Sequence, residues 1–236
     1  MRRRYILIIL LTVVLTAIVV YTTVYFSAKP AQLAGVDTAN TFYQHKVIPV
    51  VVQNEIKAAL SYYPELKETS IHFVFDPNTS KSIMLSQPVL GSIFRGQTGR
   101  AYVVKINPNF VMAHGSMPIQ NVPKDILVGW FGHELGHITD YTHRSNANMI
   151  LFGLRYVCSD YYLMQAERNA DGYAVEHGLA DYIIKTKNFI LHTADLPQAY
   201  KDRIKKLYLS PQQIMDMTKK LKKDPDTTHI KSPAAI

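Results

Sequence analysis

His133 and His137 stand four positions apart and enclose Glu134, within a stretch whose apolar spacing predicts one long helix. Residues four apart project from the same face of a helix, so both imidazole rings can reach a single ion. Zinc accepts imidazole nitrogens as ligands in tetrahedral sites, at distances of roughly 2.0 to 2.1 Å. The spacing and the residue types therefore predict two ligands of a bound zinc ion.

Glu134 lies beside the histidine face, where its carboxylate can contact a water molecule on the metal without becoming a ligand. Zinc lowers the pKa of such a water towards about 7, and the carboxylate can take its proton as the oxygen attacks a carbonyl. The same group can then pass that proton to the leaving amine. The motif thus predicts metal-assisted hydrolysis with Glu134 as general base, and Gly136 is expected to let another segment approach the helix closely.

Two histidines leave a third protein ligand to be found among the acidic residues downstream. Glu167 and Asp171 are four apart on the next strong helical pattern, so one helix face presents two carboxylates. One of them can bind the metal, and the other can accept the free ring N–H of a ligand histidine. The alternatives are structural: a histidine pair on an ordinary helix, and a solvated acidic helix face.

The two motifs together resemble those of the gluzincin metallopeptidases, the group that includes thermolysin and the membrane-bound endopeptidases that process prenylated proteins. The form Glu167-Arg168-Asn169-Ala170-Asp171 is similar to the processing-peptidase branch. The chain departs from that branch in having one apparent membrane span and a minimal domain. The resemblance implies a zincin-like fold with one zinc ion, in which His133, His137 and Glu167 are ligands, Glu134 is the base and Asp171 supports a ligand histidine.

The resemblance also implies a substrate-binding strand and an oxyanion-stabilising side chain. An extended strand before the metal helix is expected to bind peptide by β-addition, although the same segment could equally be an ordinary interior strand. This segment consists of Ala101, Tyr102, Val103, Val104 and Lys105. A histidine, tyrosine or arginine beyond the glutamate helix is expected to stabilise the oxyanion. The candidates, among which the sequence does not choose, are His177, His192, Tyr200 and Arg203.

The elements that must position these residues follow the order helix, strands, helices, which predicts an α+β fold with a small sheet and a mainly helical C-terminal half. The first helix is expected within residues 41–63, in two pieces around Pro49. Extended segments are expected at residues 71–75, at residues 83–95 with breaks at Pro88 and Gly91, and at residues 100–107. Helices are expected at residues 123–141, 149–157, 160–177 and 181–192, with Gly178 as a left-handed cap, and from a capping box at Ser210 to Leu221.

A run of 22 residues without a charge, residues 5–26, precedes these elements. As a helix it is long enough to span a bilayer core of roughly 30 Å. Three arginines at positions 2–4 stand before it and only Lys29 follows closely, which favours an N-terminus in the cytoplasm. The sequence therefore predicts a cytoplasmic segment 1–4, a transmembrane anchor 5–26, a linker 27–40 and an extracytoplasmic domain 41–236.

A cleavable signal peptide, and hence secretion, is the alternative to this anchor, because Ser27 and Ala28 are small residues. The uncharged run is longer than the roughly 7 to 15 residues usual in a signal peptide, and Phe26 stands where a small residue is needed. These two features favour the anchor, so the lipid bilayer is an expected partner.

The composition of the chain excludes some partners and some kinds of cross-link. The chain has 236 residues, of which 47% are hydrophobic, enough for a sizeable core. The net charge is +8, but no basic stretch is interleaved with aromatic residues, so nucleic acid is not an expected partner. Cys158 is the only cysteine, which excludes an intramolecular disulfide, and its apolar neighbours predict a buried side chain.

These features favour a membrane-anchored zinc metalloendopeptidase that acts on peptide or protein outside the cytoplasm. One alternative is a membrane-anchored binding or assembly module that keeps the zincin fold without turnover. A zinc hydrolase of a different amide is a further alternative. An intact Glu134 favours an enzyme, since a non-catalytic relative would be free to lose it.

Overall fold

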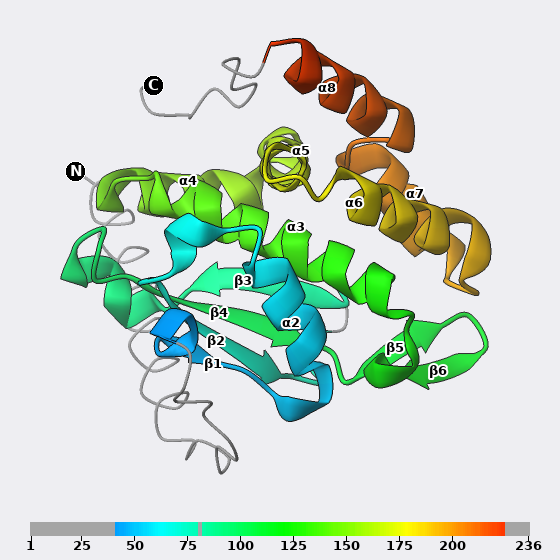
Figure 1. Cartoon of the computed structure of the whole chain (residues 1–236), viewed down its shortest axis with the longest axis horizontal. Helices are drawn as coiled ribbons and strands as arrows, with labels where there is room; N and C mark the ends of the chain where they lie inside the picture. Colours follow the sequence, from blue (N-terminus) through cyan, green and yellow to red (C-terminus); the bar gives the residue numbers. More distant parts are fainter. Residues whose placement is uncertain (1–40, 80–81, 225–236) are drawn as a thin grey trace, which may run out of the picture. The chain divides into compact units, whose positions relative to one another are not determined.

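A computed structural model of the chain describes residues 41–79 and 82–224 (Figure 1). The predicted cytoplasmic segment 1–4, anchor 5–26 and linker 27–40 lie outside these residues. Within the described ranges, no helix has the length and apolar character needed to cross a membrane.

The main sheet has four strands in the order β1-β2-β4-β3, of which the first three are parallel and β3 runs antiparallel to β4. A separate antiparallel pair, β5 and β6, follows. The strands are β1 (Lys46–Val47), β2 (Ser70–Phe75), β3 (Met84–Pro88), β4 (Ala101–Ile106), β5 (Asn109–Met112) and β6 (Gly115–Pro118).

Helices dominate the chain after Pro123, and Figure 1 shows α3 between the sheet and the later helices. The α-helices are α2 (Gln53–Leu60), α3 (Lys124–Thr142), α4 (Asn146–Cys158), α5 (Asp160–Glu176), α6 (Ala180–Asn188), α7 (Gln198–Leu207) and α8 (Pro211–Lys223). Short 3-10 segments are η1 (Thr41–Tyr43), η2 (Val50–Val52), η3 (Pro64–Leu66), η4 (Leu90–Arg95) and η5 (Ile119–Asn121), and η6 (Phe189–Thr193) is a π-helical turn. The fold class is α+β, as predicted.

The helix α3 is the centre of the core, since every residue from Ile126 to Tyr141 is buried. It contacts α2 and β3 as well as α5 and α6. Its aromatic side chains join the layers: Phe131 lies 6.0 Å from the ring of Phe73 on β2. A helix that is apolar on most sides needs partners all round, and α3 has them. Any polar group on α3 is therefore held in a buried setting.

The helix predicted for residues 41–63 is wrong in its first half. Lys46–Val47 instead forms β1, which pairs with β2. The cause is tertiary: the Lys46 ammonium donates hydrogen bonds to the carbonyls of Leu66, Lys67 and Thr69, which holds this segment extended. The break at Pro49 is confirmed, because η2 and then α2 begin after it.

The extended segment predicted for residues 83–95 is confirmed only as far as Pro88, because Leu90–Arg95 turns into η4. Sequence reasoning missed the β5–β6 pair, and it missed α7, which buries only Ile204 and Leu207 and so has a weak apolar pattern. The capping box at Ser210 and the left-handed Gly178, at φ 85°, are confirmed.

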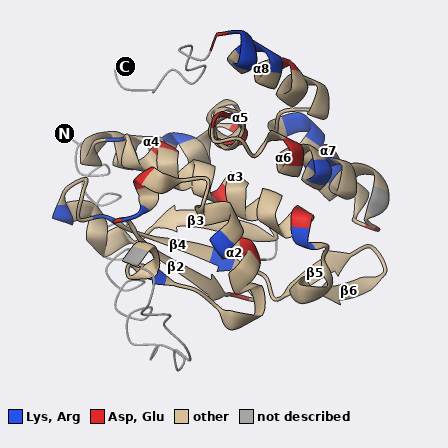
Figure 2. Cartoon of the chain, in the orientation of Figure 1, with Lys and Arg blue, Asp and Glu red and all other residues tan. Residues whose placement is uncertain are grey.

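The basic residues near the C-terminal end of the described chain face solvent on α7 and α8 (Figure 2). They are Lys205, Lys206, Lys219, Lys220, Lys222 and Lys223. These lysines supply much of the positive charge of the domain, and their side chains are solvated.

Candidate metal centre

The close approach of α3 and α5 depends on Gly136. A Cβ atom built at this position would lie 2.4 Å from the carbonyl oxygen of Ala170, far inside van der Waals contact. The expectation that Gly136 lets another segment approach is therefore confirmed, and that segment is α5. Because Glu167 lies one turn before Ala170 and Asp171 directly follows it, the same approach brings their carboxylates to the histidine face of α3.

The side chains of His133, His137 and Glu167 converge at this contact. Glu167 Oε2 lies 3.1 Å from Nε2 of His133 and 3.3 Å from Nε2 of His137. All three residues are buried, and their candidate ligand atoms lie within 4.8 Å of one another. Ligand atoms around a tetrahedral zinc ion with bonds of 2.0 to 2.1 Å lie roughly 3.3 to 3.4 Å apart. The donor set therefore fits a metal ion of this size and preference, and these residues could bind one.

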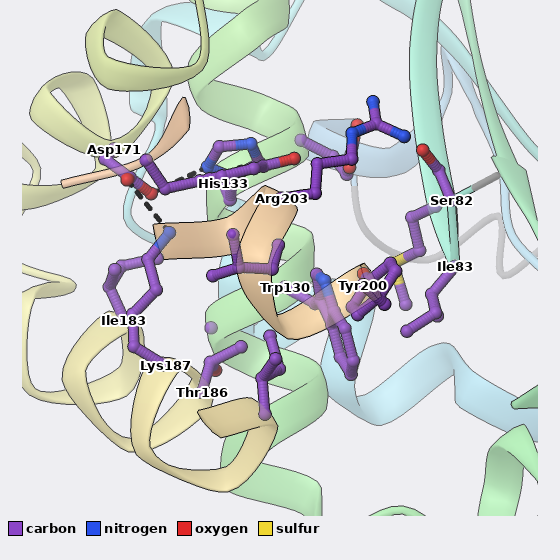
Figure 3. Close-up of a pocket in the computed structure, with 16 residues that line it drawn as sticks. Ser82, Ile83, Trp130, His133, Asp171, Ile183, Thr186, Lys187, Tyr200 and Arg203 are labelled. Carbon is purple, nitrogen blue, oxygen red and sulfur yellow. Dashed lines mark hydrogen bonds and ion pairs between the residues drawn. The ribbon is translucent and has the colours of Figure 1, made fainter. Parts of the chain in front are cut away.

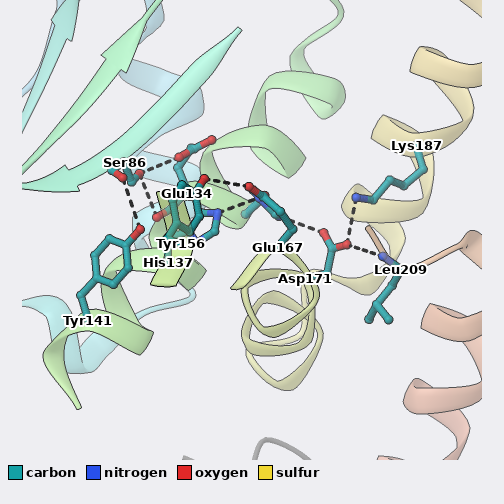
Figure 4. A network of polar contacts seen from close by, with 10 residues as sticks. Ser86, Glu134, His137, Tyr141, Tyr156, Glu167, Asp171, Lys187 and Leu209 are labelled. Atoms are coloured by element: carbon teal, nitrogen blue, oxygen red, sulfur yellow. Dashed lines mark hydrogen bonds and ion pairs between the residues drawn. The ribbon is translucent and has the colours of Figure 1, made fainter. Parts of the chain in front are cut away.

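Asp171 fixes the orientation of the His133 ring. Its Oδ1 lies 2.9 Å from Nδ1 of His133, and its Oδ2 accepts hydrogen bonds from the Lys187 ammonium and the Leu209 amide (Figure 4). Burial alone raises the pKa of Asp171, but Lys187 and His133 outweigh burial and lower it. An ionised carboxylate only accepts hydrogen bonds, so Nδ1 of His133 carries a hydrogen and Nε2 is the ring nitrogen left to face the centre.

The electrostatics of the centre favour a cation. Burial alone lowers the pKa of His133, but the hydrogen bonds and charges of Asp171 and Glu167 raise it to about 9. Burial raises the pKa of Glu167, and the two histidines together bring it well below its ordinary value. A positive charge, either a proton or a metal ion, is thus stabilised between the imidazole nitrogens and the carboxylate.

Glu134 is buried beside the centre, and the Ser86 hydroxyl on β3 donates a hydrogen bond of 2.7 Å to its Oε2. A cavity of about 30 Å³ adjoins Glu134 and His133 (Figure 3). A space of this size holds about one or two water molecules. The general base and the candidate metal ligand therefore face one small polar space.

A larger cavity, of about 300 Å³, adjoins the small one, and Tyr200 and Arg203 of α7 line both. The structure thus brings two of the four oxyanion candidates towards His133 and Glu134. His177 lies elsewhere: its Nε2 is 2.9 Å from Glu65 and its ring stacks on Tyr63. His192 is exposed and lines neither cavity.

The segment from Ala101 to Lys105 is an interior strand, so the expectation that it binds peptide by β-addition is wrong. It belongs to β4, which pairs with β2 on one side and with β3 on the other. Lys105 is buried in an ion pair of 3.0 Å with Asp76. The edge strand near the centre is β3, which has one strand partner among the described residues and carries Ser86, whose carbonyl accepts a hydrogen bond of 3.4 Å from the Tyr141 hydroxyl.

Sequence reasoning missed three residues that contact the centre: Ser86, Tyr156 and Lys187. The Tyr156 hydroxyl donates to Oε1 of Glu167 at 3.2 Å. The sequence could have indicated Lys187, because it lies at helical spacing in an apolar stripe with Ile183 and Ile190. A charged residue in such a stripe indicates a buried partner of opposite charge. No comparable pattern in the sequence indicates Ser86.

Cys158 is exposed, so the prediction of a buried thiol is wrong. It lies at the end of α4, on the side of the helix that faces away from the core.

Comparison of the chain with protein-family models, curated proteins and solved structures finds no match.

Proposed function

We propose that the chain is a membrane-anchored zinc metalloendopeptidase of the gluzincin type, with a zincin-like fold. The observation that carries this proposal is the convergence of His133, His137 and Glu167 at the spacing of tetrahedral ligands, with Glu134 beside them. Two imidazoles and a carboxylate are the ligand set of several zinc peptidases. Nitrogen ligands of this kind favour zinc over magnesium or calcium.

Zinc bound by these residues supplies a Lewis acid that polarises a carbonyl and lowers the pKa of a water molecule towards about 7. Glu134 would accept a proton from that water as its oxygen adds to the peptide carbonyl, and would give the proton to the amine as the C–N bond breaks. The Ser86 hydroxyl holds one oxygen of Glu134, which directs the other towards the small cavity. Asp171 keeps His133 in the ligating tautomer.

Peptide binding is assigned to the free edge of β3. An extended peptide can add to this edge through main-chain hydrogen bonds, which leaves alternate side chains free to enter pockets. Ser86 lies on β3 and contacts Glu134, so a peptide on this edge passes close to the base. The cavity of about 300 Å³ can accept one of its side chains.

The proposed anchor is the uncharged run at residues 5–26, with the domain outside the cytoplasm. A reporter enzyme fused after Ile236 is expected to be active only outside the cytoplasm. Activity inside would reverse the orientation. Release of the whole domain from membranes, with a new N-terminus after Phe26, would support signal cleavage and secretion instead.

The catalytic proposal is tested on the full chain in detergent by metal analysis together with a broad peptide library. The wild type is expected to bind one zinc ion and to cleave, whereas His133→Ala and Glu167→Ala lose stoichiometric metal. Glu134→Gln is expected to keep the zinc and to lose activity by about 10²- to 10⁴-fold, since it removes the general base. Glu68→Gln, at a largely exposed carboxylate, is the control that keeps both.

Three outcomes would contradict parts of the proposal. Full zinc in Glu167→Ala removes that residue from the ligand set. Zinc binding without cleavage of any library peptide favours the non-catalytic binding or assembly module. Cleavage of other amides alone favours a different hydrolase.

A further inference from the structure

The helix α4 has two apolar faces, and the domain buries only one of them. Met149 is buried, and Phe152 and Tyr156 pack inward as well. On the opposite side of the helix, Leu154 is 61% exposed and Val157 is 83% exposed. Ile150 and Leu151 each lie three or four residues before Leu154, and Val157 lies three after it, so these residues form one stripe.

The outer stripe continues onto the neighbouring elements. It consists of Ile150, Leu151, Leu154 and Val157 of α4, Tyr161 of α5 and Phe94 of η4, and is called here the α4 face. Phe94 is 82% exposed, and η4 contacts α4. Arg100, shortly after η4, donates hydrogen bonds to the Tyr141 and Arg144 carbonyls and to the Asn146 side chain. These bonds hold η4 against the start of α4, so the α4 face is one fixed surface.

Two arginines border the α4 face, and the carboxylate of Asp160, next to Tyr161, is paired with Lys206 at 2.7 Å. The sequence has no aspartate or glutamate between Asp76 and Asp125, which includes η4, nor between Asp140 and Asp160, which includes α4. Arg155 is the only charged residue of α4, and its guanidinium lies 5.1 Å from the ring of Tyr162. Arg95 is exposed on η4. Aliphatic side chains bordered by tyrosine and arginine match the interface of a phospholipid bilayer, where rings lie at headgroup depth and guanidinium groups reach phosphate.

The length of chain before the domain limits how far the domain can lie from a membrane. The described domain begins at Thr41, and a fully extended linker of residues 27–40 reaches roughly 46 to 50 Å. Thr41 therefore stays within that distance of the bilayer, and the tether raises the effective concentration of the domain at the lipid, so a modest apolar area suffices. This step rests on the proposed anchor at residues 5–26.

We propose that the α4 face lies on the lipid bilayer. Its aliphatic side chains lie below the phosphates, and the guanidinium groups of Arg95 and Arg155 lie among the phosphates. The inner side of the same helix carries Tyr156, which contacts Glu167. An α-helix is roughly 10 to 12 Å across with its side chains. The docked helix therefore places the metal centre about one helix diameter above the headgroups, within reach of peptide segments that leave the membrane.

Cys158 gives a direct test, because it is the only cysteine in the chain and it is exposed at the end of α4. The full chain is labelled there with an environment-sensitive fluorophore and reconstituted into vesicles of phosphatidylcholine with phosphatidylglycerol. The expected result is a shift of emission to shorter wavelength and a loss of intensity when the lipids carry a quencher on the upper acyl chain. The matched control, Cys158→Ser with Ser116→Cys, places the label on β6, at the other end of the view in Figure 1, and is expected to be insensitive.

A second variant, Leu154→Glu with Val157→Glu, is expected to abolish the quenching at Cys158 while the chain keeps its helical content. Quenching of the label by aqueous iodide but not by lipid would overturn the proposal. Protection from both quenchers, with Cys158 cross-linked between two chains, would replace the bilayer by a second copy.

Carbonate extraction of the same vesicles separates the anchor from the docking surface. If carbonate does not extract the chain but the label remains accessible to water, the chain has the anchor and the α4 face does not bind the bilayer. A chain that carbonate removes, but whose label was quenched by lipid beforehand, docks without the anchor.

Discussion

The Nδ1 atom of His133 on α3 lies 2.9 Å from Oδ1 of Asp171 on α5, and this contact extends into a third helix. The other oxygen of Asp171 accepts a hydrogen bond from Lys187 on α6, also at 2.9 Å. A candidate metal ligand is therefore oriented by a chain of charges that crosses three helices. Since Asp171 and Lys187 are both buried, each depends on the other to offset the cost of its burial.

Lys187→Met is expected to lower the free energy of unfolding by about 3 to 5 kcal/mol, because it leaves the Asp171 carboxylate buried without its cation. It is also expected to weaken zinc binding about 10- to 100-fold, since Asp171 then holds His133 less firmly. Denaturant unfolding of the full chain in detergent measures the first effect, and competition with a chelator measures the second. Lys185→Met, two residues away in an exposed pair with Asp125, is the control and is expected to change both far less. Equal effects of the two substitutions would show that burial of Lys187 is not what matters.

Gly136→Ala is expected to force α3 and α5 apart, because the new methyl group would meet the Ala170 carbonyl at 2.4 Å. Backbone cannot move aside as a flexible side chain can, so we expect a loss of about 1 to 3 kcal/mol in stability. The separation also moves Glu167 away from the histidines, and stoichiometric zinc should be lost. Thermal unfolding and metal analysis measure these effects.

Gly153→Ala is the matched substitution, since Gly153 is also helical but has nothing within 4 Å of the added carbon. Here the change is expected to stabilise the chain by about 0.5 to 1 kcal/mol, through the better helix propensity of alanine. A Gly136 variant that behaves like this one would contradict the close packing of α3 on α5.

The residues of the centre were predictable because helical spacing and ligand chemistry are local properties of a sequence. The period of two helices, and the assumption that these helices are in contact, were enough to predict His133, His137, Glu167 and Asp171. Gly136 indicated this contact, because glycine lets two helices approach closely. The contact of Ser86 with Glu134 was not predictable, because it depends on which strand of the sheet lies against α3.

The strand order explains why the substrate segment was misassigned. Ala101–Ile106 has the most strand-like pattern before α3, and such a strand is the one that a sheet places inside, with partners on both sides. The edge strand is β3, a shorter segment that ends at Pro88. Proline cannot donate a hydrogen bond to a neighbouring strand, so it is tolerated at an edge. In the same way, Lys46 lies in a helical pattern by sequence, but three distant carbonyls hold it in β1.

The pair of Glu65 on η3 and His177 at the end of α5 predicts a specific dependence of stability on pH. Burial alone would raise the pKa of Glu65 and lower that of His177. Their hydrogen bond outweighs burial, so the pKa of Glu65 falls below 4.5 and that of His177 rises above 6.5. The ionised glutamate contributes its full stabilisation of the fold above pH 4.5, and this stabilisation is lost as the pH falls through its lowered pKa. The histidine contributes fully below 6.5 and loses its contribution as the pH rises through its raised pKa.

Glu65→Gln is therefore expected to lower the melting temperature most between pH 4.5 and pH 6.5, where both groups are charged in the wild type. The difference from wild type should shrink as the pH rises through the raised pKa of His177, because the imidazole then loses its proton. Melting curves across this range measure it. A difference that grows with rising pH would show that another group controls the titration.

Tyr200 and Arg203 stand one turn apart on α7 and line both cavities, of which the smaller adjoins Glu134. Burial raises the pKa of the Tyr200 hydroxyl above its ordinary value of 10, so it keeps its hydrogen at any working pH and can donate to a developing oxyanion. Tyr200→Phe is expected to lower kcat by about 10²- to 10³-fold with little change in KM, since an oxyanion forms only in the transition state. Arg203→Met tests whether the neighbouring cation shares this role, and His192→Asn, at an exposed site, is the control. A Tyr200 variant with raised KM and normal kcat would assign the hydroxyl to substrate binding, because a group that holds substrate and transition state equally changes KM alone.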